Sequence, residues 1–425
     1  MRKIVIRGGR TLHGDIPVSG MKNAALPIIF GCILTSDVCT LENIPDVTDV
    51  NLSLEILASM GAKIDRLSKT SVKIDATDMV CGESPRELVS RLRTSTYLLG
   101  AELGRFGTAK VGFSGGCDFG GRPIDQHKKG FELFGASFSI EDGCHYMNSP
   151  RGLHGASIYL DIASVGATVN LMLAACMIPG KTTIDNAARE PHIVDLANFL
   201  NMCGARISGA GTSFIKITGV DKLHGCTYTI IPDMIEAGTY MVAAAATGGR
   251  VNVRGVIPKH METVTAKLIE MGCGVDENDD SITVSRSTRL TGTSIKTYFY
   301  PGFPTDMHPQ FAALLATADG TSGITEGVFE NRFRYVEELR KMNACINASG
   351  RTASIVGVKQ LSGAPVTAVD LRAGAALIVA GLAARGTTEI YNIETIERGY
   401  DDIVNKLRGI GADIELVCSD DVYAD

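Results

Sequence analysis

The sequence predicts an α/β (α+β) protein of two domains, each built from three similar repeats. The chain has 425 residues, which is too long for a single hydrophobic core. A helix-like stretch that ends in glycine or asparagine, followed by a β-branched residue, recurs six times. A second, almost wholly apolar helix accompanies each recurrence. Strands that alternate with helices in this way are typical of layered α/β domains.

The residue that ends the amphipathic helix marks each repeat. Successive marks are 74, 69, 68, 71 and 68 residues apart, at Gly61, Gly135, Gly204, Gly272, Asn343 and Gly411. Glycine and asparagine tolerate the left-handed conformation that commonly ends a helix. We therefore predict a helix stop at each mark and a strand directly after it. Three of these repeats end near residue 228.

The accompanying helices are apolar nearly all round, which predicts that they are buried. They are expected over residues 23–36, 95–106, 165–179, 236–247, 308–319 and 372–385. Five of them end at a glycine that leads into a short strand. The strand expected at residues 2–8 precedes the first repeat and could pair with either domain.

Composition limits the class of partner. The net charge is −6, which gives no reason to expect nucleic acid or an anionic membrane. The start of the chain lacks a signal-peptide core, and the longest apolar runs are too short to span a membrane, so we expect a soluble cytoplasmic protein. The 11 cysteines have no metal-site spacing, and we expect most of them to be reduced and buried, among them Cys32, Cys176, Cys203 and Cys345.

A glycine-rich loop at residues 114–125 surrounds Cys117 and precedes Arg122. Loops on a rigid scaffold often carry a protein's chemistry. An arginine there would lower the pKa of the thiol and attract an anionic substrate. The alternative is a surface turn that contains a cysteine by chance.

Polar residues also recur at the starts of the buried helices. They are Lys22 and Asn23, Arg93, Ser164 with Val165 and Gly166, Asp306, and Arg372. A helix N-terminus is electropositive, and together with Arg122, Arg332 and Arg398 these starts would form an anion-selective cleft. Each residue alone is more often a solvated charge or a cap, but their recurrence at one phase of the repeat favours a shared site. Asp306 is the only acid in this pattern, and it is either a general base or an N-cap.

Nine short motifs, in order along the chain, together resemble one enzyme family. They are GMKNAALP at 20–27, GGC at 115–117, GRP at 121–123, SVGAT at 164–168, NAAREP at 186–191, FPTD at 303–306, ENRF at 330–333, DLRA at 370–373 and ERGY at 397–400. This pattern is similar to that of the UDP-N-acetylglucosamine 1-carboxyvinyltransferases, a branch of the enolpyruvyl transferases. The resemblance extends over essentially the whole chain.

The resemblance implies two inside-out α/β domains, each of three βαβαββ-type repeats, with the active site in the cleft between them. The implied domains are residues 22–229, with the Cys117 loop, and residues 1–21 plus 230–425, with Asp306, Arg332, Arg372 and Arg398. The implied reaction transfers the enolpyruvyl group of phosphoenolpyruvate to the 3-hydroxyl of UDP-N-acetylglucosamine. It proceeds by addition and elimination through a tetrahedral ketal, releases phosphate and begins peptidoglycan synthesis. It implies no metal or organic cofactor, a monomeric protein, and inhibition by fosfomycin at Cys117.

The resemblance also implies a role for each matching residue. The implied catalytic residues are Cys117, Asp306, Lys22 and Arg398, of which Cys117 is the general acid that protonates phosphoenolpyruvate and Asp306 is the base for the sugar hydroxyl. Phosphoenolpyruvate would contact Lys22, Asn23, Arg122, Arg332, Arg372 and Arg398. UDP-N-acetylglucosamine would contact Asn23, Arg93, Arg122, Pro123, Ile124, Asp125, Gln126, Ser164, Val165, Gly166, Asp306 and Val328.

Two positions depart from the family pattern, and two other functions stay open. Ile162 stands where some members have a nucleotide-contacting lysine, and Tyr97 where some have tryptophan near the uracil. The first alternative is the sister enzyme that acts on shikimate 3-phosphate, against which the Cys117 loop argues. The second is a non-catalytic regulator that binds the nucleotide sugar, against which the complete set of matching catalytic residues argues.

Overall fold

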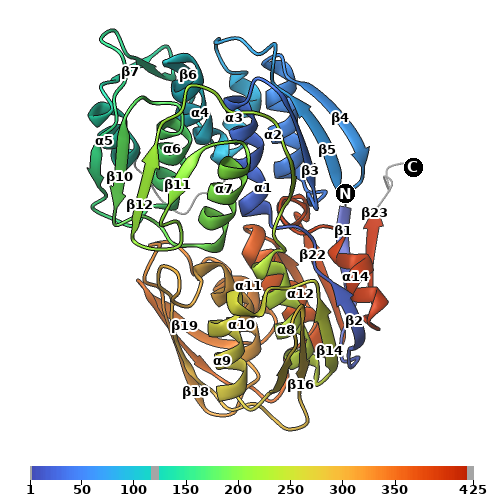
Figure 1. Cartoon of the computed structure of the whole chain (residues 1–425). Coiled ribbons are helices and arrows are strands. Elements are labelled where there is room, and N and C mark those ends of the chain that lie inside the picture. The colour runs from blue at the N-terminus through green and yellow to red at the C-terminus, as the bar shows by residue number, and fades with distance from the viewer. Residues whose placement is uncertain (1, 116–123, 419–425) are drawn as a thin grey trace. The chain divides into compact units, whose positions relative to one another are not determined.

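The structure is a computed structural model that describes residues 2–115 and 124–418. The chain divides into two compact units: in Figure 1 one runs from blue to green, and the other runs from yellow-green to red and also contains the dark blue strands near the N-terminus. The N-terminal unit is Gly20–Ile231, and the C-terminal unit is Met1–Ser19 together with Pro232–Asp425. The chain therefore passes from one unit to the other twice.

The N-terminal unit contains three sheets in its described part, with strand orders β13-β3-β5-β4, β6-β8-β7 and β11-β12-β10-β9. Its strands are β3 (Val38–Glu42), β4 (Lys63–Ser68), β5 (Ser71–Asp75), β6 (Thr108–Gly112), β7 (Ser137–Glu141), β8 (Cys144–Asn148), β9 (Ser157–Tyr159), β10 (Lys181–Asp185), β11 (Arg206–Ser208), β12 (Phe214–Thr218) and β13 (Thr227–Thr229). Its helices are α1 (Lys22–Gly31), α2 (Thr48–Ser59), α3 (Arg86–Arg91), α4 (Tyr97–Phe106), α5 (Asp125–Leu133), α6 (Val165–Ala175) and α7 (Pro191–Met202), with 3₁₀ turns η1 (Cys32–Leu34) and η2 (Arg93–Thr96).

Over residues 2–19 and 232–418, the C-terminal unit also has three sheets, with strand orders β21-β22-β1-β23, β15-β16-β14-β2 and β17-β18-β20-β19. Its strands are β1 (Arg2–Arg7), β2 (His13–Pro17), β14 (Arg250–Arg254), β15 (Gly274–Glu277), β16 (Ser281–Ser285), β17 (Ser294–Lys296), β18 (Thr321–Thr325), β19 (Cys345–Ser349), β20 (Thr352–Val356), β21 (Pro365–Thr367), β22 (Thr387–Tyr391) and β23 (Ile414–Cys418). Its helices are α8 (Met234–Thr247), α9 (Glu262–Glu270), α10 (His308–Leu315), α11 (Val336–Lys341), α12 (Leu371–Ala383), α13 (Glu394–Glu397) and α14 (Ile403–Gly409), with 3₁₀ turns η3 (Pro258–His260) and η4 (Thr305–Met307).

The third repeat shows the βαβαββ unit completely, as β9-α6-β10-α7-β11-β12. Its central strand β10 pairs in parallel with β9, at Ile184 and Ile158, and antiparallel with β12, at Ile184 and Ile215. In the first and fourth repeats the leading strand comes from elsewhere in the sequence: β13 pairs in parallel with β3, and β2 with β14. Strand β1 lies between β22 and β23, so residues 2–7 belong to the C-terminal unit.

The apolar helices form the interior of each unit, and the sheets and amphipathic helices surround them (Figure 1). Helices α1, α4 and α6 are buried in one unit and α8, α10 and α12 in the other. Helix α4 packs closely on α6 because Gly100 has no side chain: a Cβ there would lie 2.2 Å from the Asn170 carbonyl oxygen. The Asn170 side chain accepts the Gly100 N–H at 2.8 Å, which fixes this contact. This arrangement confirms the predicted fold class.

The backbone confirms the predicted helix stops. All six marks are left-handed, with φ of 99° at Gly61, 92° at Gly135, 101° at Gly204, 100° at Gly272, 68° at Asn343 and 99° at Gly411. The prediction for Cys345 is wrong, because this residue begins the edge strand β19 and faces solvent, whereas Ile346 faces the interior. Cys32, Cys176 and Cys203 are buried as predicted.

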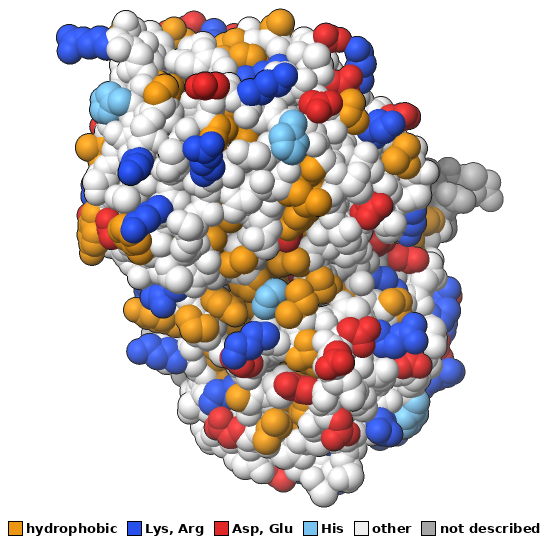
Figure 2. All heavy atoms as spheres, viewed as in Figure 1, with side chains coloured by type: hydrophobic (Ala, Val, Ile, Leu, Met, Phe, Trp, Pro, Cys, Tyr) orange, Lys and Arg blue, Asp and Glu red, His pale blue; other side chains and the backbone are white. Residues whose placement is uncertain are grey.

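The surface carries both signs of charge. Figure 2 shows basic and acidic side chains on the visible face of each unit. Within residues 2–115 and 124–418, every helix is too short or too polar to cross a membrane.

Candidate functional site

The strongest cluster of predicted site residues surrounds Asp306 in the C-terminal unit. Arg332 Nη2 donates to Asp306 Oδ1 at 2.7 Å. On the other oxygen, Oδ2, the carboxylate accepts from Arg372 Nε at 3.1 Å and Nη2 at 3.0 Å. The two arginine side chains are only 3% and 5% exposed, whereas that of Asp306 is 28% exposed. The carboxylate is therefore held by two buried cations and is itself open to solvent.

Three different segments bring these residues together. Asp306 lies in the 3₁₀ turn η4 directly before α10, and Arg332 in the segment between β18 and α11. Arg372 is the second residue of α12, whose N-cap Asp370 accepts the N–H groups of Arg372 and Ala373 at 2.8 and 2.9 Å. The guanidinium carbon of Arg372 also lies 5.6 Å from the centre of the Tyr400 ring. The cap thus fixes the backbone of Arg372, and the ring contacts its guanidinium group.

Burial disfavours the charge on Arg372, but Asp306, Tyr400 and Asp233 together outweigh it and raise the pKa of Arg372 above its ordinary value. Arg372 Nη1 is also buried and has no hydrogen-bond acceptor among the described residues. A buried guanidinium donor without an acceptor is costly unless an anion supplies one. The cluster is thus suited to hold a further carboxylate or phosphate oxygen.

A second buried acid, Glu326, organises the backbone around this cluster. It is 1% exposed, and its Oε1 accepts the N–H groups of Val328 at 2.7 Å and Phe329 at 2.9 Å. Its Oε2 accepts the Thr305 hydroxyl at 2.8 Å and lies 3.2 Å from His308 Nε2. Burial and the positive charge of Arg332 hold the pKa of His308 well below its usual value, so His308 is neutral. Glu326 thereby fixes both the turn before Asp306 and the segment that carries Val328.

The predicted residues of the N-terminal unit also lie at the starts of its buried helices. Lys22 and Asn23 open α1, and Lys22 is buried, with its Nζ 3.0 Å from Asp49 Oδ2. Ser164 caps α6 by accepting the Ala167 N–H at 3.3 Å, so Val165 and Gly166 form the first turn of that helix.

His127 in α5 packs against the start of α6. A Cβ built on Gly166 would lie 3.0 Å from His127 Nε2, so any larger residue there would crowd this ring. Burial, and then the charge of Arg93, lower the pKa of His127 to about 4. His127 is therefore neutral at physiological pH, and Arg93 in η2 lies close enough to act on it.

The start of α5 holds three more of the predicted nucleotide contacts. Ile124 directly precedes the helix, and Asp125 and Gln126 are its first residues. The Gln126 amide donates to Asp125 at 2.8 Å and to Asp161 at 3.0 Å, and it accepts the Asp161 N–H at 2.9 Å. The amide of Gln126 is thus fixed, whereas Asp125 is exposed. Ile162, the family departure, is 56% exposed, and Tyr97 is buried at 7%.

Three predicted residues, Cys117, Arg122 and Pro123, lie outside the described residues. Arg398 directly follows α13 and is half-buried. The structure thus brings Asp306, Arg332 and Arg372 into direct contact and places the remaining described residues at helix starts or loops of their own units.

The alternative that Asp306 is an N-cap is wrong, because neither η4 nor α10 has a side-chain cap. The sequence patterns did not single out Asp49, Glu326 or His308, and Tyr400 stood out only as the last residue of the ERGY motif. Asp49 resembled an ordinary first-turn acid of an amphipathic helix. The signal in the sequence for Glu326 was its position, since it is an acid that lies directly after a strand and directly before Gly327.

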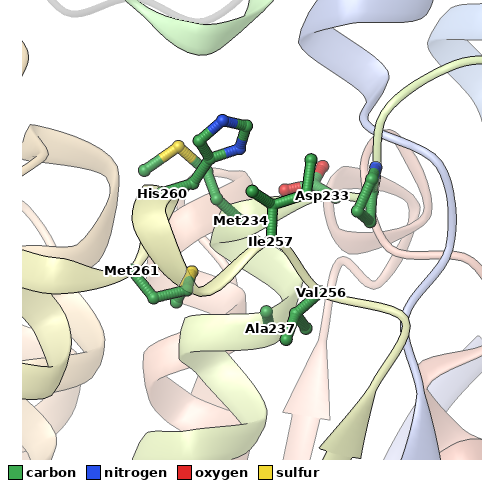
Figure 3. A pocket seen from close by; sticks show the side chains of 8 residues that line it. Asp233, Met234, Ala237, Val256, Ile257, His260 and Met261 are labelled. Carbon is green, nitrogen blue, oxygen red and sulfur yellow. The ribbon is translucent and has the colours of Figure 1, made fainter. Parts of the chain in front are cut away.

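A small hollow beside the start of α8 contains none of the predicted residues (Figure 3). It is lined by Pro232, Asp233, Met234, Ala237, Val256, Ile257, His260 and Met261. Asp233 uses one carboxylate oxygen to cap α8, at 2.7 Å from the Ile235 N–H and 3.1 Å from the Glu236 N–H. Burial lowers the pKa of His260. The hollow is mostly apolar and lacks the paired cations of the Asp306 cluster.

Comparison with known proteins identifies the family. The sequence profile described as EPSP synthase (3-phosphoshikimate 1-carboxyvinyltransferase) matches residues 6–407. A protein of Caldanaerobacter subterraneus subsp. tengcongensis named UDP-N-acetylglucosamine 1-carboxyvinyltransferase 3 is 54% identical over 414 residues, which are 97% of this chain and 99% of that protein. The chain belongs to this family of carboxyvinyltransferases. It is therefore a transferase, as the motifs predict.

Other relatives agree. UDP-N-acetylglucosamine 1-carboxyvinyltransferase of Clostridium botulinum is 51% identical over 97% of this chain and 99% of its own length. Among solved structures, the enolpyruvyl transferase NikO from Streptomyces tendae has a TM-score of 0.87 at 27% identity and covers 99% of both chains. EPSP synthase from Acinetobacter baumannii has a TM-score of 0.75 at 20% identity, over 98% of this chain and 100% of that chain, which shows a shared fold. The carboxyvinyltransferase fold is thus common to enzymes with different acceptors.

Proposed function

We propose that this carboxyvinyltransferase transfers the enolpyruvyl group of phosphoenolpyruvate to the 3-hydroxyl of UDP-N-acetylglucosamine and releases phosphate. The observation that carries this choice of acceptor is the 50–54% identity, over nearly the whole chain, to relatives named for it. The profile match names a different acceptor, but it describes the whole family, and the Acinetobacter enzyme with that acceptor is only 20% identical.

The Asp306 cluster supports the sugar-activating and carboxylate-binding parts of the reaction. We assign Asp306 as the base that takes the proton of the 3-hydroxyl, since its carboxylate is solvent-accessible while both arginines are buried. A carboxylate between two cations is a weak base, so its contribution comes from position. The unpaired donor Arg372 Nη1, with Arg332, would receive the carboxylate of phosphoenolpyruvate. Val328, whose backbone is held by Glu326, would contact the sugar.

The helix starts of the N-terminal unit would bind the other anionic groups. Lys22 and Arg122, together with Arg398 of the C-terminal unit, are assigned to the phosphate of phosphoenolpyruvate, and Asn23 lies next to Lys22 in the chain. The nucleotide is assigned to Arg93, to residues 122–126 and to the first turn of α6, where a diphosphate gains from unpaired N–H groups and the helix dipole.

Cys117 completes the proposed reaction as the acid. A proton moves from its thiol to the methylene carbon of phosphoenolpyruvate while the sugar oxygen bonds to C2, which gives a tetrahedral ketal. Loss of a proton from the new methyl group and departure of phosphate then form the enolpyruvyl ether. The same sulfur would open the epoxide of fosfomycin, a small phosphonate. We further propose a monomer that acts in the cytoplasm without a cofactor.

Phosphate release tests the proposal. The enzyme is incubated with phosphoenolpyruvate and either UDP-N-acetylglucosamine or shikimate 3-phosphate. We expect turnover with the nucleotide sugar alone. Comparable rates with shikimate 3-phosphate, or release with neither acceptor, would overturn the assignment. Mass spectrometry after fosfomycin treatment tests Cys117 separately: we expect a single adduct on the peptide that contains residue 117, and an adduct elsewhere would refute its role.

A further inference from the structure

Four cysteines that the proposed reaction does not use converge in the N-terminal unit. Cys32 lies in η1, Cys39 in β3, Cys203 directly after α7 and Cys226 directly before β13. The Sγ atoms of Cys203 and Cys226 are 3.5 Å apart. The Cys39 thiol interacts with those of Cys203, Cys226 and Cys32. Sequence positions as far apart as 32 and 226 thus supply one group of thiols.

Backbone hydrogen bonds hold the closest pair in place. The Cys203 carbonyl accepts the His224 N–H at 2.9 Å, and the Cys226 carbonyl accepts the Thr40 N–H at 2.8 Å. The strand that follows Cys226 pairs in parallel with β3, where Thr227 lies opposite Thr40. Both cysteines therefore lie on fixed backbone, and the approach of their sulfurs follows from the fold.

The two sulfurs differ in access. Cys203 is completely buried, whereas Cys226 is partly exposed. A small oxidant can reach Cys226 first, and Cys203 is then the neighbour that can attack the oxidised sulfur. By contrast, Cys176 is buried, and its pKa is raised to about 12 by burial alone.

Metal binding is the competing use of such a group. Within the described residues, however, no three His, Cys, Asp or Glu side chains are arranged to hold a metal ion. The short distance therefore favours a reaction between two thiols.

We propose that Cys203 and Cys226 are a modification site, which forms a reversible disulfide when the protein meets a peroxide. The Cys226 sulfur attacks hydrogen peroxide and becomes a sulfenic acid, with release of one water. The Cys203 sulfur then attacks that sulfur, the S–S bond forms, and a second water leaves. The two thiols lose two electrons and two protons in total, and the peroxide gains them.

The environment of the thiols sets the pH dependence. A hydrogen bond from Cys203 lowers the pKa of Cys226, but its interaction with Cys39 and its burial outweigh this and leave the pKa at about 11. Because the thiolate is the reactive form, the pair should react slowly at pH 7, and its rate should rise roughly ten-fold for each unit by which the pH increases toward the pKa of Cys226.

Trypsin allows a direct test on the full-length protein, since the sequence places the two cysteines in separate peptides. Cys203 lies in residues 190–206, Cys226 in residues 223–250, and both Cys32 and Cys39 in residues 23–63. After treatment with hydrogen peroxide at pH 7 and pH 9, the digest is analysed by mass spectrometry without reductant. We expect a cross-link of the first two peptides that has lost two hydrogen atoms, forms faster at pH 9, and disappears with dithiothreitol.

Two matched variants sharpen the test. Cys226→Ser should reduce this cross-link at least ten-fold, whereas Cys345→Ser, at an exposed cysteine of the C-terminal unit, should leave it unchanged. Circular dichroism checks that both variants are folded. Oxidation of Cys345 without a 203–226 cross-link would overturn the proposal, and so would a dominant cross-link to the peptide of Cys39. The result is independent of the acceptor specificity, because no substrate is present.

Discussion

The two units differ in the acidic side chains that lie at the starts of their buried helices. In the C-terminal unit, Asp233 caps α8 and Asp370 caps α12, and Asp306 before α10 is bound by two arginines. In the N-terminal unit, α1 and α4 have no side-chain cap, and α6 is capped by the uncharged Ser164. The helix starts of the C-terminal unit therefore carry acids next to them in the chain, whereas in the N-terminal unit the acid at the start of α1, Asp49, comes from α2 and is paired with Lys22.

The buried acids within the helices of the two units also differ in their partners. Glu236 in α8 is 2% exposed and is bound by Lys406 Nζ at 2.6 Å and by the Tyr240 hydroxyl at 2.6 Å. Glu102 in α4 is fully buried, and among the described residues it receives one hydrogen bond, from the Lys110 N–H at 3.2 Å. Burial raises the pKa of Glu102 to about 8, so it is mostly protonated at neutral pH. The N-terminal unit therefore has few fixed anions at its buried helices, which suits the binding of an anionic nucleotide.

The largest expected effect comes from Asp306→Asn, which tests whether the acids of the C-terminal unit have different roles. The amide keeps the size but cannot accept the proton, so kcat should fall by roughly 10²–10⁴ with a modest change in KM. Asp370→Asn is the matched control. Because asparagine caps a helix about as well as aspartate, its kcat should stay within about two-fold of the parent enzyme. Steady-state phosphate release measures both, and equal losses would remove the distinction.

Glu102→Gln should stabilise the protein. Burial raises the pKa of Glu102 in the folded state to about 8, from its ordinary value of 4.5, so the folded protein retains a proton that the unfolded chain releases. The parent protein should therefore lose stability as the pH rises from 4.5 to 8. The glutamine variant removes this loss and should be more stable by about 3 kcal/mol at pH 7, but nearly unchanged at pH 4.5. Urea unfolding at both pH values measures the difference.

Glu236→Gln is the control for this change and should have the opposite sign. It removes the partner of Lys406, whose side chain is 15% exposed, and so leaves a largely buried cation unpaired. If both variants stabilise the protein, the contrast between the two buried acids is wrong.

Arg372→Lys tests the unpaired guanidinium donor. Lysine keeps the positive charge, but its single ammonium group cannot replace both the Nε and Nη2 hydrogen bonds to Asp306 and the Nη1 donor that remains for the substrate. Loss of one charged hydrogen bond to the substrate should raise the KM for phosphoenolpyruvate by roughly 10–100-fold. Arg351→Lys, at an exposed surface pair with Glu330, is the control and should leave KM unchanged. An unchanged KM in Arg372→Lys would place the substrate carboxylate elsewhere.

The smallest effects are expected at the helix caps. Asp370→Ala and Ser164→Ala should each lower the free energy of unfolding by about 1 kcal/mol, since each removes a side-chain acceptor from a helix start. They should differ in binding. Only Ser164→Ala should weaken the binding of UDP-N-acetylglucosamine, because Ser164 is assigned to the nucleotide. Calorimetry measures the affinity of both variants. Equal affinities would argue against that assignment.

Local sequence patterns predicted much of the fold. The left-handed stops from Gly61 to Gly411 were readable because few residue types tolerate that conformation, and the buried helices because they are apolar on every side. The same patterns predicted Asp306 and Arg372 as site residues, since both stand at a recurring helix start. They could not show that Cys345 faces solvent, because an edge strand and a central strand can have similar sequences.

The sequence by itself determined the repeat, the helix starts and the residue types available for anion binding, because these depend on local conformation and composition. Only the tertiary structure decided the pairings: which arginines bind Asp306, that Glu326 holds the backbone of Val328, and that Cys203 lies beside Cys226. The physical reason is distance along the chain. Arg332 and Arg372 are 26 and 66 residues from Asp306, and contacts at such separations are set by how the helices and sheets of a unit pack.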